Sequence, residues 1–524
     1  MRFAALLAPS LSSACLFLPA MLAAQAPAAP ARYARPSAEV RRAAETITVE
    51  YLRHGVYTIA DDSMGGRDTP SRGLDLTADY VASEFAKAGL RPAGDNGSWH
   101  QRYPLFLSRT LVEDSRVEFT MTGGPTLSFS LSSSALRRFG TTPRPVSGPV
   151  AVIGGAIDTV ALAGSPLANR VVVWPAEMPT GGNPAGLQPV LRALNRVGAS
   201  ALVLISNRTD PAGFRRAVQA QSRPTASRDS VAGPTGGLVV VEIAQEELRG
   251  QLPEAVDQLA PLRGQPAFVL LEMPEWTGTV DIRRTVERGS APNTVGILEG
   301  TDPVLRNEYI VFSAHMDHVG DNGTGEDRIY NGADDDASGT IGIVALARAY
   351  AQPGARPKRS LIFLTVSGEE KGLWGSEYFA QHPPVPLGQM VANINMDMIG
   401  RNWPDSIVVI GKEHSDLGAT LNAVNAAHRE LGMVPMDDIW PNERFYFRSD
   451  HYNFARNGVP VLFFFNGVHA DYHRVSDTPD KIGYDKMSRI LRLGFYLGTE
   501  VANRPDRPQW NPDSYRQIVQ PRTP

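Results

Sequence analysis

The chain has 524 residues, of which 42% are hydrophobic and 20% charged, and its formal net charge is −4. This length exceeds one ordinary domain, so we expect two or three domains of a globular protein. The small net charge gives no reason to expect nucleic acid or an anionic membrane surface as a partner.

The start of the chain has the pattern of a secretory signal peptide. Arg2 provides the positive charge, an apolar stretch runs from Phe3 to Leu22, and Ala24-Gln25-Ala26 is the small-x-small pattern that precedes a cleavage site. The alternative is a membrane anchor, which two prolines and several serines in the stretch disfavour. We therefore expect residues 1–26 to be removed and the protein to be periplasmic or extracellular, without membrane insertion of the mature form.

Cys15 is the only cysteine of the chain. It lies inside the apolar stretch and resembles a lipoprotein attachment site only weakly, because Ser12 stands where an aliphatic residue is required. The mature chain would then contain no disulfide. An exported protein without disulfides depends for its stability on its core and on any metal that it binds.

Three elements are predicted after a leader rich in Ala and Pro at residues 27–37. Helical patterns occur at 38–53 and from Thr77, and Gly89 ends the second helix. The stretch Gln101 to Leu107 has the pattern of a strand.

Short apolar runs alternate with Gly, Pro and Ser turns from Thr110 to Val286. Val171–Trp174 and Ala201–Ile205 are buried strand candidates, and Pro184–Val197 between them has a helical pattern. The region contains no cluster of histidines and carboxylates, so we assign it no chemistry.

After Thr294 the pattern alternates between apolar strands and helices, which predicts an α/β fold with a mostly parallel mixed sheet covered by helices on both faces. The strand candidates are Tyr309–Ala314, Leu361–Val366, Val391–Met396, Ile407–Ile410 and Val461–Phe465, and the helix candidates are Ser338–Tyr350, Ser415–Leu431 and Lys486–Val501. Residues 504–524 are polar and Pro-rich, and we predict a tail without regular structure.

Two histidines and three carboxylates are the candidate metal ligands of the chain, and most of them follow a strand-like run. They are His315, Asp335, Glu370, Asp397 and His473. In open α/β sheets, functional groups gather beyond the carboxyl ends of the strands, so we expect these residues to meet at one edge. Their chemistry suits two zinc ions that share one carboxylate.

Glu369, directly before Glu370, is the candidate general base. Two adjacent like charges after a buried strand are costly without a cation nearby. Each ligand has a common alternative, since a single histidine in a loop or an aspartate at a helix start is usually structural. Asp336 is expected to cap the helix that begins near Ser338. His318 and His469 are expected to line the site rather than to bind metal.

Taken together, these residues make the chain resemble the di-zinc exopeptidase family of bacterial leucyl aminopeptidases and glutamate carboxypeptidases. The resemblance rests on five motifs in the family's order, which are His315-Met316-Asp317, Gly332-Ala333-Asp334-Asp335-Asp336-Ala337-Ser338-Gly339, Ser367-Gly368-Glu369-Glu370, Asn395-Met396-Asp397 and Asp471-Tyr472-His473. The segment from Gly65-Gly66-Arg67 to Gly89-Leu90 also resembles the start of this peptidase domain.

The resemblance implies a role for each residue and a cofactor of two Zn²⁺ per chain. Asp335 would bridge the metals, and a cis peptide bond would join it to Asp336. His315 with Asp397 and Glu370 with His473 would complete the two sites. The remaining roles are Asp317 as the carboxylate that orients His315, Glu369 as the base that takes a proton from a metal-bridging water, and Tyr446 as the oxyanion donor. Tyr446 has the alternative of a core aromatic residue.

The resemblance also implies the domain organisation. The peptidase domain would comprise residues 38–109 and 287–503, and 504–524 would be a C-terminal tail. Residues 110–286 resemble a protease-associated domain inserted between its two parts, and the alternative is an unrelated β-rich insert.

We therefore predict a secreted zinc metalloexopeptidase that acts on peptide substrates, most simply as an aminopeptidase. A carboxypeptidase is the first alternative, with Arg448 and Arg401 available to bind a terminal carboxylate. A glutaminyl cyclase and a non-catalytic binding ectodomain of the same fold, as in the transferrin receptor, are weaker alternatives. Carboxylate-rich sites also accept cobalt or manganese. Side-chain preference, natural substrate and oligomeric state are not encoded in any motif.

Overall fold

The computed structural model describes residues 33–520 except 34, 134–135, 139–143, 178–185, 209, 211, 216–217, 219–223, 229–237 and 324. The predicted signal peptide and most of the predicted leader lie outside the described residues. Among the described residues, no helix is both long and apolar enough to cross a bilayer.

The larger of two sheets has the strand order β17-β16-β18-β15-β13-β14-β12-β2-β9, and β1 pairs with β12. Its strands are β1 (Arg91–Pro92), β2 (His100–Thr110), β9 (Thr225–Ser227), β12 (Arg284–Leu298), β13 (Tyr309–His315), β14 (Ser360–Val366), β15 (Met390–Met396), β16 (Ser406–Ile410), β17 (Val434–Met436) and β18 (Val461–Phe465). The four central strands β14, β13, β15 and β18 are parallel, whereas β12 and β2 join antiparallel at one side. The predicted mixed α/β sheet is confirmed, with its parallel part confined largely to the centre.

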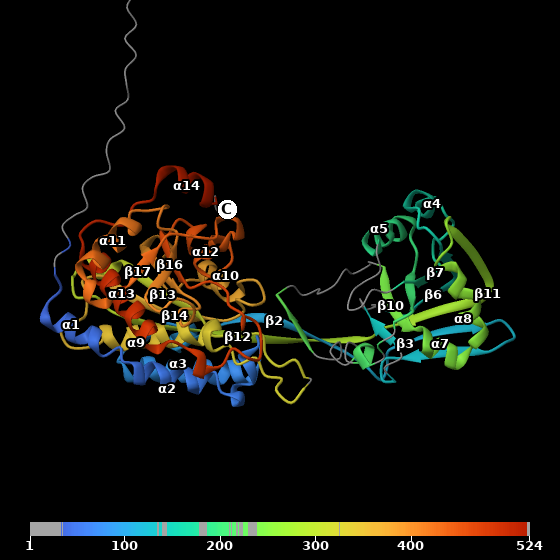
Figure 1. Cartoon of the computed structure of the whole chain (residues 1–524), viewed down its shortest axis with the longest axis horizontal. Coiled ribbons are helices and arrows are strands. Elements are labelled where there is room, and N and C mark those ends of the chain that lie inside the picture. The colour runs from blue at the N-terminus through green and yellow to red at the C-terminus, as the bar shows by residue number, and fades with distance from the viewer. Residues whose placement is uncertain are drawn as a thin grey trace, which may run out of the picture.

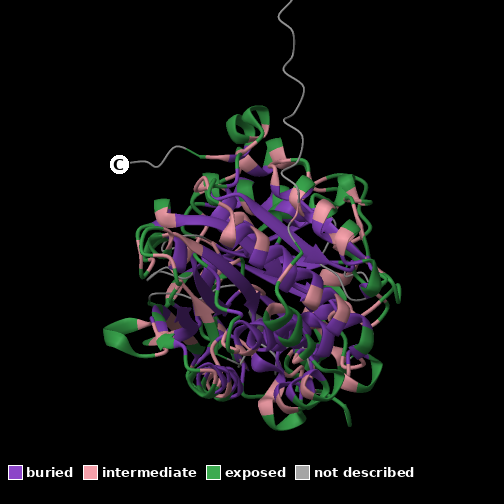
Figure 2. Cartoon of the chain, turned by 90° about the vertical axis from the view of Figure 1, so that its left-hand side faces the viewer, coloured by how far each residue is buried: buried purple, intermediate pink, exposed green. Residues whose placement is uncertain are grey.

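Helices cover both faces of this sheet, because the central strands are apolar on both sides. Residues Ile310 and Phe312 of β13 join one core cluster, and Val311 between them joins the other. The first cluster takes residues from α1 (Ala38–Glu45), α2 (Val49–Ile59), α3 (Arg72–Lys87), α9 (Gly339–Tyr350), α11 (Leu417–Ala427) and α13 (Tyr484–Asn503). The second takes residues from α10 (Trp374–Gln381), α12 (His451–Ala455) and α14 (Pro512–Ile518). Figure 2 shows these buried strands and helix faces enclosed by exposed loops.

The second sheet has the order β4-β3-β11-β6-β7-β8-β10-β5. Its strands are β3 (Arg116–Met121), β4 (Thr126–Ser130), β5 (Leu136–Arg138), β6 (Val146–Gly154), β7 (Val171–Ala176), β8 (Ala201–Ser206), β10 (Val239–Ala244) and β11 (Val269–Asp281). The helices α4 (Thr159–Ala163) and α5 (Leu187–Val197) lie on one face, and α7 (Gln245–Gln251) and α8 (Pro253–Leu259) on the other. The strand–helix–strand unit predicted around Gly198 is therefore present as β7, α5 and β8.

A two-stranded ribbon connects the two sheets (Figure 1). It consists of β2 and β12, which pair antiparallel from His100 opposite Thr294 to Thr110 opposite Arg284. The predicted domain limits at residues 109/110 and 286/287 fall inside these two strands. In the sequence, all strands of the second sheet lie between β2 and β12, and β9 from the same stretch returns to pair with β2 in the larger sheet. The identity of the second sheet as a protease-associated domain stays a prediction.

Two predicted segments differ from the structure. The helix predicted at 38–53 is two helices, because α1 ends at Glu45 and Thr48 caps α2 by accepting a hydrogen bond from the Tyr51 N–H. The predicted tail is wrong for residues 504–520, which include α14. Trp510 anchors this segment by donating from Nε1 to the Gly458 carbonyl at 2.9 Å.

Candidate metal centre

The five predicted ligands meet at one edge of the larger sheet. His315 is the last residue of β13, Glu370 follows β14, and Asp397 follows β15. His473 lies in the loop after β18, and Asp335 lies in the turn Ala333–Ser338 that precedes α9. Because β13, β14, β15 and β18 are parallel neighbours, their carboxyl ends place these side chains together.

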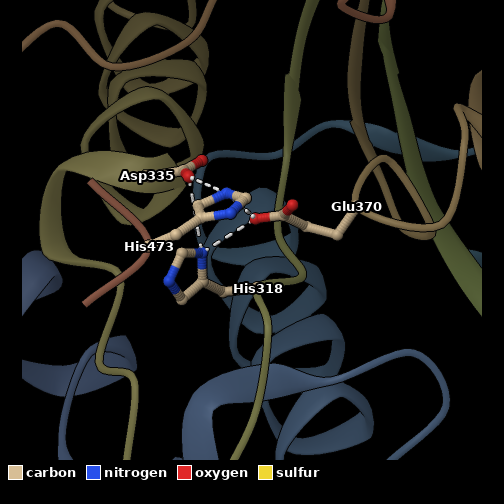
Figure 3. A group of neighbouring side chains, drawn as sticks. All are labelled: His318, Asp335, Glu370 and His473. Atoms are coloured by element: carbon tan, nitrogen blue, oxygen red, sulfur yellow. Dashed lines mark ion pairs between the residues drawn. The ribbon is translucent and has the colours of Figure 1, made fainter. Parts of the chain in front are cut away.

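The side chains form two adjacent groups that could each hold a metal ion. One comprises His315, Asp335 and Asp397, and the other comprises His318, Asp335, Glu370 and His473. Figure 3 shows the four residues of the second group converging on one point. The ligand atoms of each group lie within 4.8 Å of one another.

Asp335 belongs to both groups, and its two oxygens face different ones. Oδ1 lies 3.3 Å from Nε2 of His315, whereas Oδ2 lies 3.0 Å from Nε2 of His473 and 3.6 Å from Nδ1 of His318. The peptide bond between Asp335 and Asp336 is cis, as the resemblance implies. This carboxylate therefore has the orientation of a ligand shared by two metal ions.

The donor set fits zinc. In the part of the chain that the structure describes, five buried atoms of the second group form no hydrogen bond, although four of them lie within 3.6 Å of an oppositely charged atom of the group. They are Oδ2 of Asp335, Oε1 of Glu370, Nε2 of His473 and both ring nitrogens of His318. Buried polar atoms are normally satisfied, and leaving several unsatisfied at one point is costly. Imidazole nitrogens and carboxylate oxygens at this spacing are what a divalent cation would satisfy.

His318 differs from the prediction that it only lines the site. Its Nδ1 lies 3.0 Å from Oε1 of Glu370, as close as Nε2 of His473, which is 3.1 Å away. The sequence did not predict that His318 lies beside Glu370 and His473, because that proximity depends on the path of three separate loops. His469 remains apart from both groups and lies 3.3 Å from Oδ2 of Asp334.

The charges of this site shift the pKa values of its members. Burial alone would raise the pKa of Asp335, but the nearby imidazoles of His318, His315 and His473 hold it well below its usual value. Burial would lower the pKa of His315, but the carboxylates of Asp397 and Glu369 raise it well above its usual value. The centre is thus dominated by attraction between opposite charges in a buried environment.

Glu369 lies beside the first group without belonging to it. It lines the same cleft as His315, Asp335 and Asp397. Burial raises the pKa of Glu369 well above its usual value, and the neighbouring carboxylates add to this rise. A raised pKa makes a carboxylate a stronger base, which suits it to accept a proton.

Asp317 connects the first group to Glu369. Its carboxylate accepts a hydrogen bond from the Glu369 N–H at 3.3 Å and another from the hydroxyl of Thr69 at 2.9 Å. Nδ1 of His315 lies closer to the main-chain carbonyl of Asp317, at 3.1 Å, than to its carboxylate, at 3.7 Å. The imidazole of His315 is therefore oriented mainly by the main-chain carbonyl of Asp317, and the prediction had named the carboxylate.

Arg67 holds two of the ligand-bearing segments in place, a role that the sequence did not indicate. Its side chain is fully buried, and its guanidinium donates to the carbonyls of Met316 at 2.9 Å, Asn331 at 2.6 Å and Gly332 at 2.9 Å. Burial lowers the pKa of Arg67 to about 10, so the group stays protonated at neutral pH. Because all of these partners are backbone carbonyls, no side-chain pattern reveals them.

Tyr446 is buried, and its sequence neighbours Phe445 and Arg448 line the cleft beside Glu369. Its ring packs edge-on against His414 and His451, with centroid distances of 4.5 and 5.3 Å, and it belongs to an apolar core cluster. It does not line the cleft beside Glu369. Among the described residues, no hydrogen-bond partner is present for its buried hydroxyl, and the role of Tyr446 as oxyanion donor stays a prediction. Tyr472 does line the cleft, with its ring stacked on that of His473 at 3.9 Å.

Two hollows adjoin the centre. The narrow cleft beside Glu369 has a volume of about 40 Å³, and its remaining walls are largely apolar, formed by Met398, Phe445, Phe463, Phe465 and Val468. A larger cavity of about 520 Å³ adjoins His473 and is lined by polar residues, among them Asn322, Arg474 and Ser476. Tyr472 borders both hollows.

The stretch Ser449-Asp450-His451 serves the structure of the centre rather than acting as a nucleophile and base. Ser449 donates to Oδ2 of Asp397 at 2.8 Å, which fixes that ligand. His451 is fully buried, with its ring stacked on Phe463 at 4.3 Å.

The buried imidazole of His451 predicts a pH dependence of stability. Burial lowers the pKa of His451 to about 3. Below pH of about 6.5 the unfolded chain takes up a proton that the folded chain does not, so this residue destabilises the fold increasingly as pH falls toward 3. Relative to a His451→Phe variant, the wild type should lose about 1.4 kcal/mol of unfolding free energy per pH unit between pH of about 6 and 4, measured by urea titration. A difference independent of pH would contradict this account.

Comparison with known proteins finds a matching family. Residues 293–497 match the family model described as Peptidase family M28. All members of both ligand groups lie within this stretch. Residues 293–497 are therefore similar to peptidase family M28.

Part of the chain is also similar to curated proteins. A probable zinc metalloprotease of Pyricularia oryzae is 26% identical over 256 residues, covering 41% of this chain and 50% of the relative. The leupeptin-inactivating enzyme 1 of Streptomyces exfoliatus is 28% identical over 192 residues, covering 36% and 39%. A probable leucine aminopeptidase of Arthroderma otae is 27% identical over 208 residues, covering 38% and 56%. The chain thus spans about half the length of the curated relatives it matches.

The similarity in structure extends beyond residues 293–497. An aminopeptidase from Aneurinibacillus sp. strain AM-1 superimposes with a TM-score of 0.51 at 19% identity, covering 89% of this chain and 97% of that one. BSAP, a zinc aminopeptidase from Bacillus subtilis, gives a TM-score of 0.50 at 15% identity, covering 91% and 98%. At these identities the similarity shows a shared fold.

Proposed function

We propose that the chain is a zinc-dependent aminopeptidase that removes N-terminal residues from peptides, with two zinc ions per chain. The observation that carries the proposal is the orientation of Asp335, whose two oxygens face two different groups of metal-binding side chains. His315 and Asp397 would complete one zinc site. Glu370 and His473 would complete the other, and His318 lies close enough to join it.

Zinc in such a site supplies Lewis-acid polarisation of the scissile carbonyl and activation of water. The residues of the chain provide the proton transfers and the positioning. Glu369 would accept a proton and return it to the leaving amine, because it lines the cleft beside the ligands and its pKa is raised. Asp317 would position the backbone of Glu369, and Ser449 would position the carboxylate of Asp397, through the hydrogen bonds described above.

Two further observations favour a peptide N-terminus as the substrate group. The cleft beside Glu369 is small, and the part of its wall formed by Met398, Phe445, Phe463, Phe465 and Val468 is apolar, which suits one short side chain. The larger polar cavity beside His473 suits the continuing peptide. Arg401, which a carboxypeptidase could use to bind a terminal carboxylate, is already paired with Asp471 at 2.8 Å. Arg448 lines the apolar cleft, and it supports the alternative of a carboxypeptidase.

Export and the role of the second sheet are part of the same proposal. We infer export from the signal-like start of the sequence, and a protease-associated domain from the strand–helix–strand unit β7, α5 and β8. A peptidase with no cysteine after the signal segment is compatible with an oxidising compartment.

The test is mass spectrometry of one peptide offered free, N-acetylated and C-amidated, each with and without a chelator. An aminopeptidase removes the N-terminal residue from the free and C-amidated peptides, fails on the acetylated one, and stops with chelator. Loss of the C-terminal residue, blocked by amidation alone, would replace the proposal by a carboxypeptidase. Absence of cleavage of every form would favour a binding protein.

A further inference from the structure

The second sheet carries a large apolar cavity, far in sequence from the metal ligands. It has a volume of about 450 Å³ and is lined by strands of the sheet on one side and by the helix pair α7 and α8 on the other. Strands β3, β4, β6, β7, β8 and β11 contribute side chains to its wall. It shares no residue with either hollow beside the metal centre.

The wall of this cavity is formed mainly by hydrocarbon side chains. Val150, Val152 and Val173 form part of the sheet side, and Leu248 and Leu259 lie on the helix side. Protein interiors are normally packed as densely as organic crystals and contain few voids larger than a water molecule. A cavity of several hundred cubic ångströms with apolar walls and a few polar groups is instead typical of a site for a small molecule.

The strand β11 is irregular where it borders the cavity. Its pairing with β6 shifts register between Met273 and Thr277, so the residues between them form a bulge. Glu275 and Trp276 lie in this bulge and line the cavity together with Met273. Bulges commonly redirect side chains at binding sites, and methionine adapts its shape to different ligands.

Two carboxylates give the cavity its charge. Glu254 of α8 and Glu275 of β11 are both exposed and both line the cavity. Among the described residues, no ion pair or side-chain hydrogen bond involves either carboxylate. Within the described part of the chain, no lysine or arginine lines the cavity, so the charged groups found there are negative.

We propose that this cavity binds a small apolar amine, whose hydrocarbon part fills the space between sheet and helices and whose ammonium group pairs with Glu254 and Glu275. The apolar walls supply affinity through burial of hydrocarbon. The two free carboxylates select a cation over a neutral or anionic molecule of the same shape.

The test is calorimetric titration of the full chain with three compounds of equal chain length: decylamine, decanol and decanoate. Decylamine should bind more tightly than decanol, and decanoate most weakly. The double variant Glu254→Gln and Glu275→Gln should weaken decylamine about tenfold and leave decanol unchanged. Because both residues are exposed, this variant is expected to fold.

A second variant tests the location. Ala255→Trp, on the cavity side of α8, should abolish binding of all three compounds by filling the space. The matched control is Val160→Trp on α4, where the wild-type side chain is 81% exposed and outside the cavity. Equal binding of decylamine and decanoate, an amine affinity unaffected by the two Glu→Gln changes, or the absence of any binding would overturn the proposal.

Discussion

Replacement of Glu369 by glutamine is expected to lower kcat on a peptide substrate by about a hundred-fold to ten-thousand-fold, while the metal content stays unchanged. The amide keeps the size of the side chain but cannot accept a proton. Glu369 lies beside the ligand groups and is not a member of either, so its loss should not release metal. Steady-state kinetics and elemental analysis of the same preparation check both parts of the prediction.

The matched control for this variant is Glu50→Gln, an exposed glutamate in the first turn of α2. It should have wild-type kcat and metal content. Near-normal turnover of the Glu369→Gln variant would refute the assignment of the base. Loss of metal from that variant would instead make Glu369 a ligand.

The second large effect is expected at Asp335. The Asp335→Ala variant should retain almost no zinc, because the carboxylate contributes one oxygen to each of the two groups. The His473→Ala variant removes a ligand from one group only and should retain about one zinc per chain. Zinc content after gel filtration, measured by elemental mass spectrometry, distinguishes the two variants.

The same pair of variants should differ in stability. Metal that binds only the folded state stabilises it by about 2.7 kcal/mol when its concentration is a hundred times the dissociation constant. Added zinc should therefore raise the unfolding temperature of the wild type most, that of His473→Ala less, and that of Asp335→Ala least. Exposed Asp405→Asn serves as the control. Equal zinc content in the Asp335 and His473 variants would contradict a shared ligand.

Much of the larger sheet could be predicted because its central strands are buried on both faces. Runs such as Leu361–Val366 and Val461–Phe465 are continuous apolar stretches, and they are strands in the structure within a residue of the expected limits. The ribbon strand β12 could not be recognised in the same way. Its first half is largely exposed and polar, and it pairs with β2, more than 170 residues earlier in the chain.

Residues 504–520 and the side chain of Tyr446 also could not be placed from local sequence patterns. Residues 504–520 have no periodicity, yet Trp510 and Ile518 pack against the body of the domain through contacts that no local pattern encodes. Tyr446 lies near the expected motif in sequence, but the short helix Phe445–Phe447 directs its ring into the core. Position along the chain therefore did not determine which way the side chain points.

The sequence by itself indicated the chemistry of the centre, because four of the five candidate ligands and a spare glutamate follow apolar strands whose parallel ends lie at one edge. Only the tertiary structure decided how these residues divide into two groups, that His318 joins one of them, and that Arg67 holds their loops by hydrogen bonds to backbone carbonyls. The apolar cavity against α7 and α8 likewise appears only in three dimensions. The physical reason is the same in each case: strand periodicity is a local property of the chain, whereas distances between loops depend on how distant segments pack.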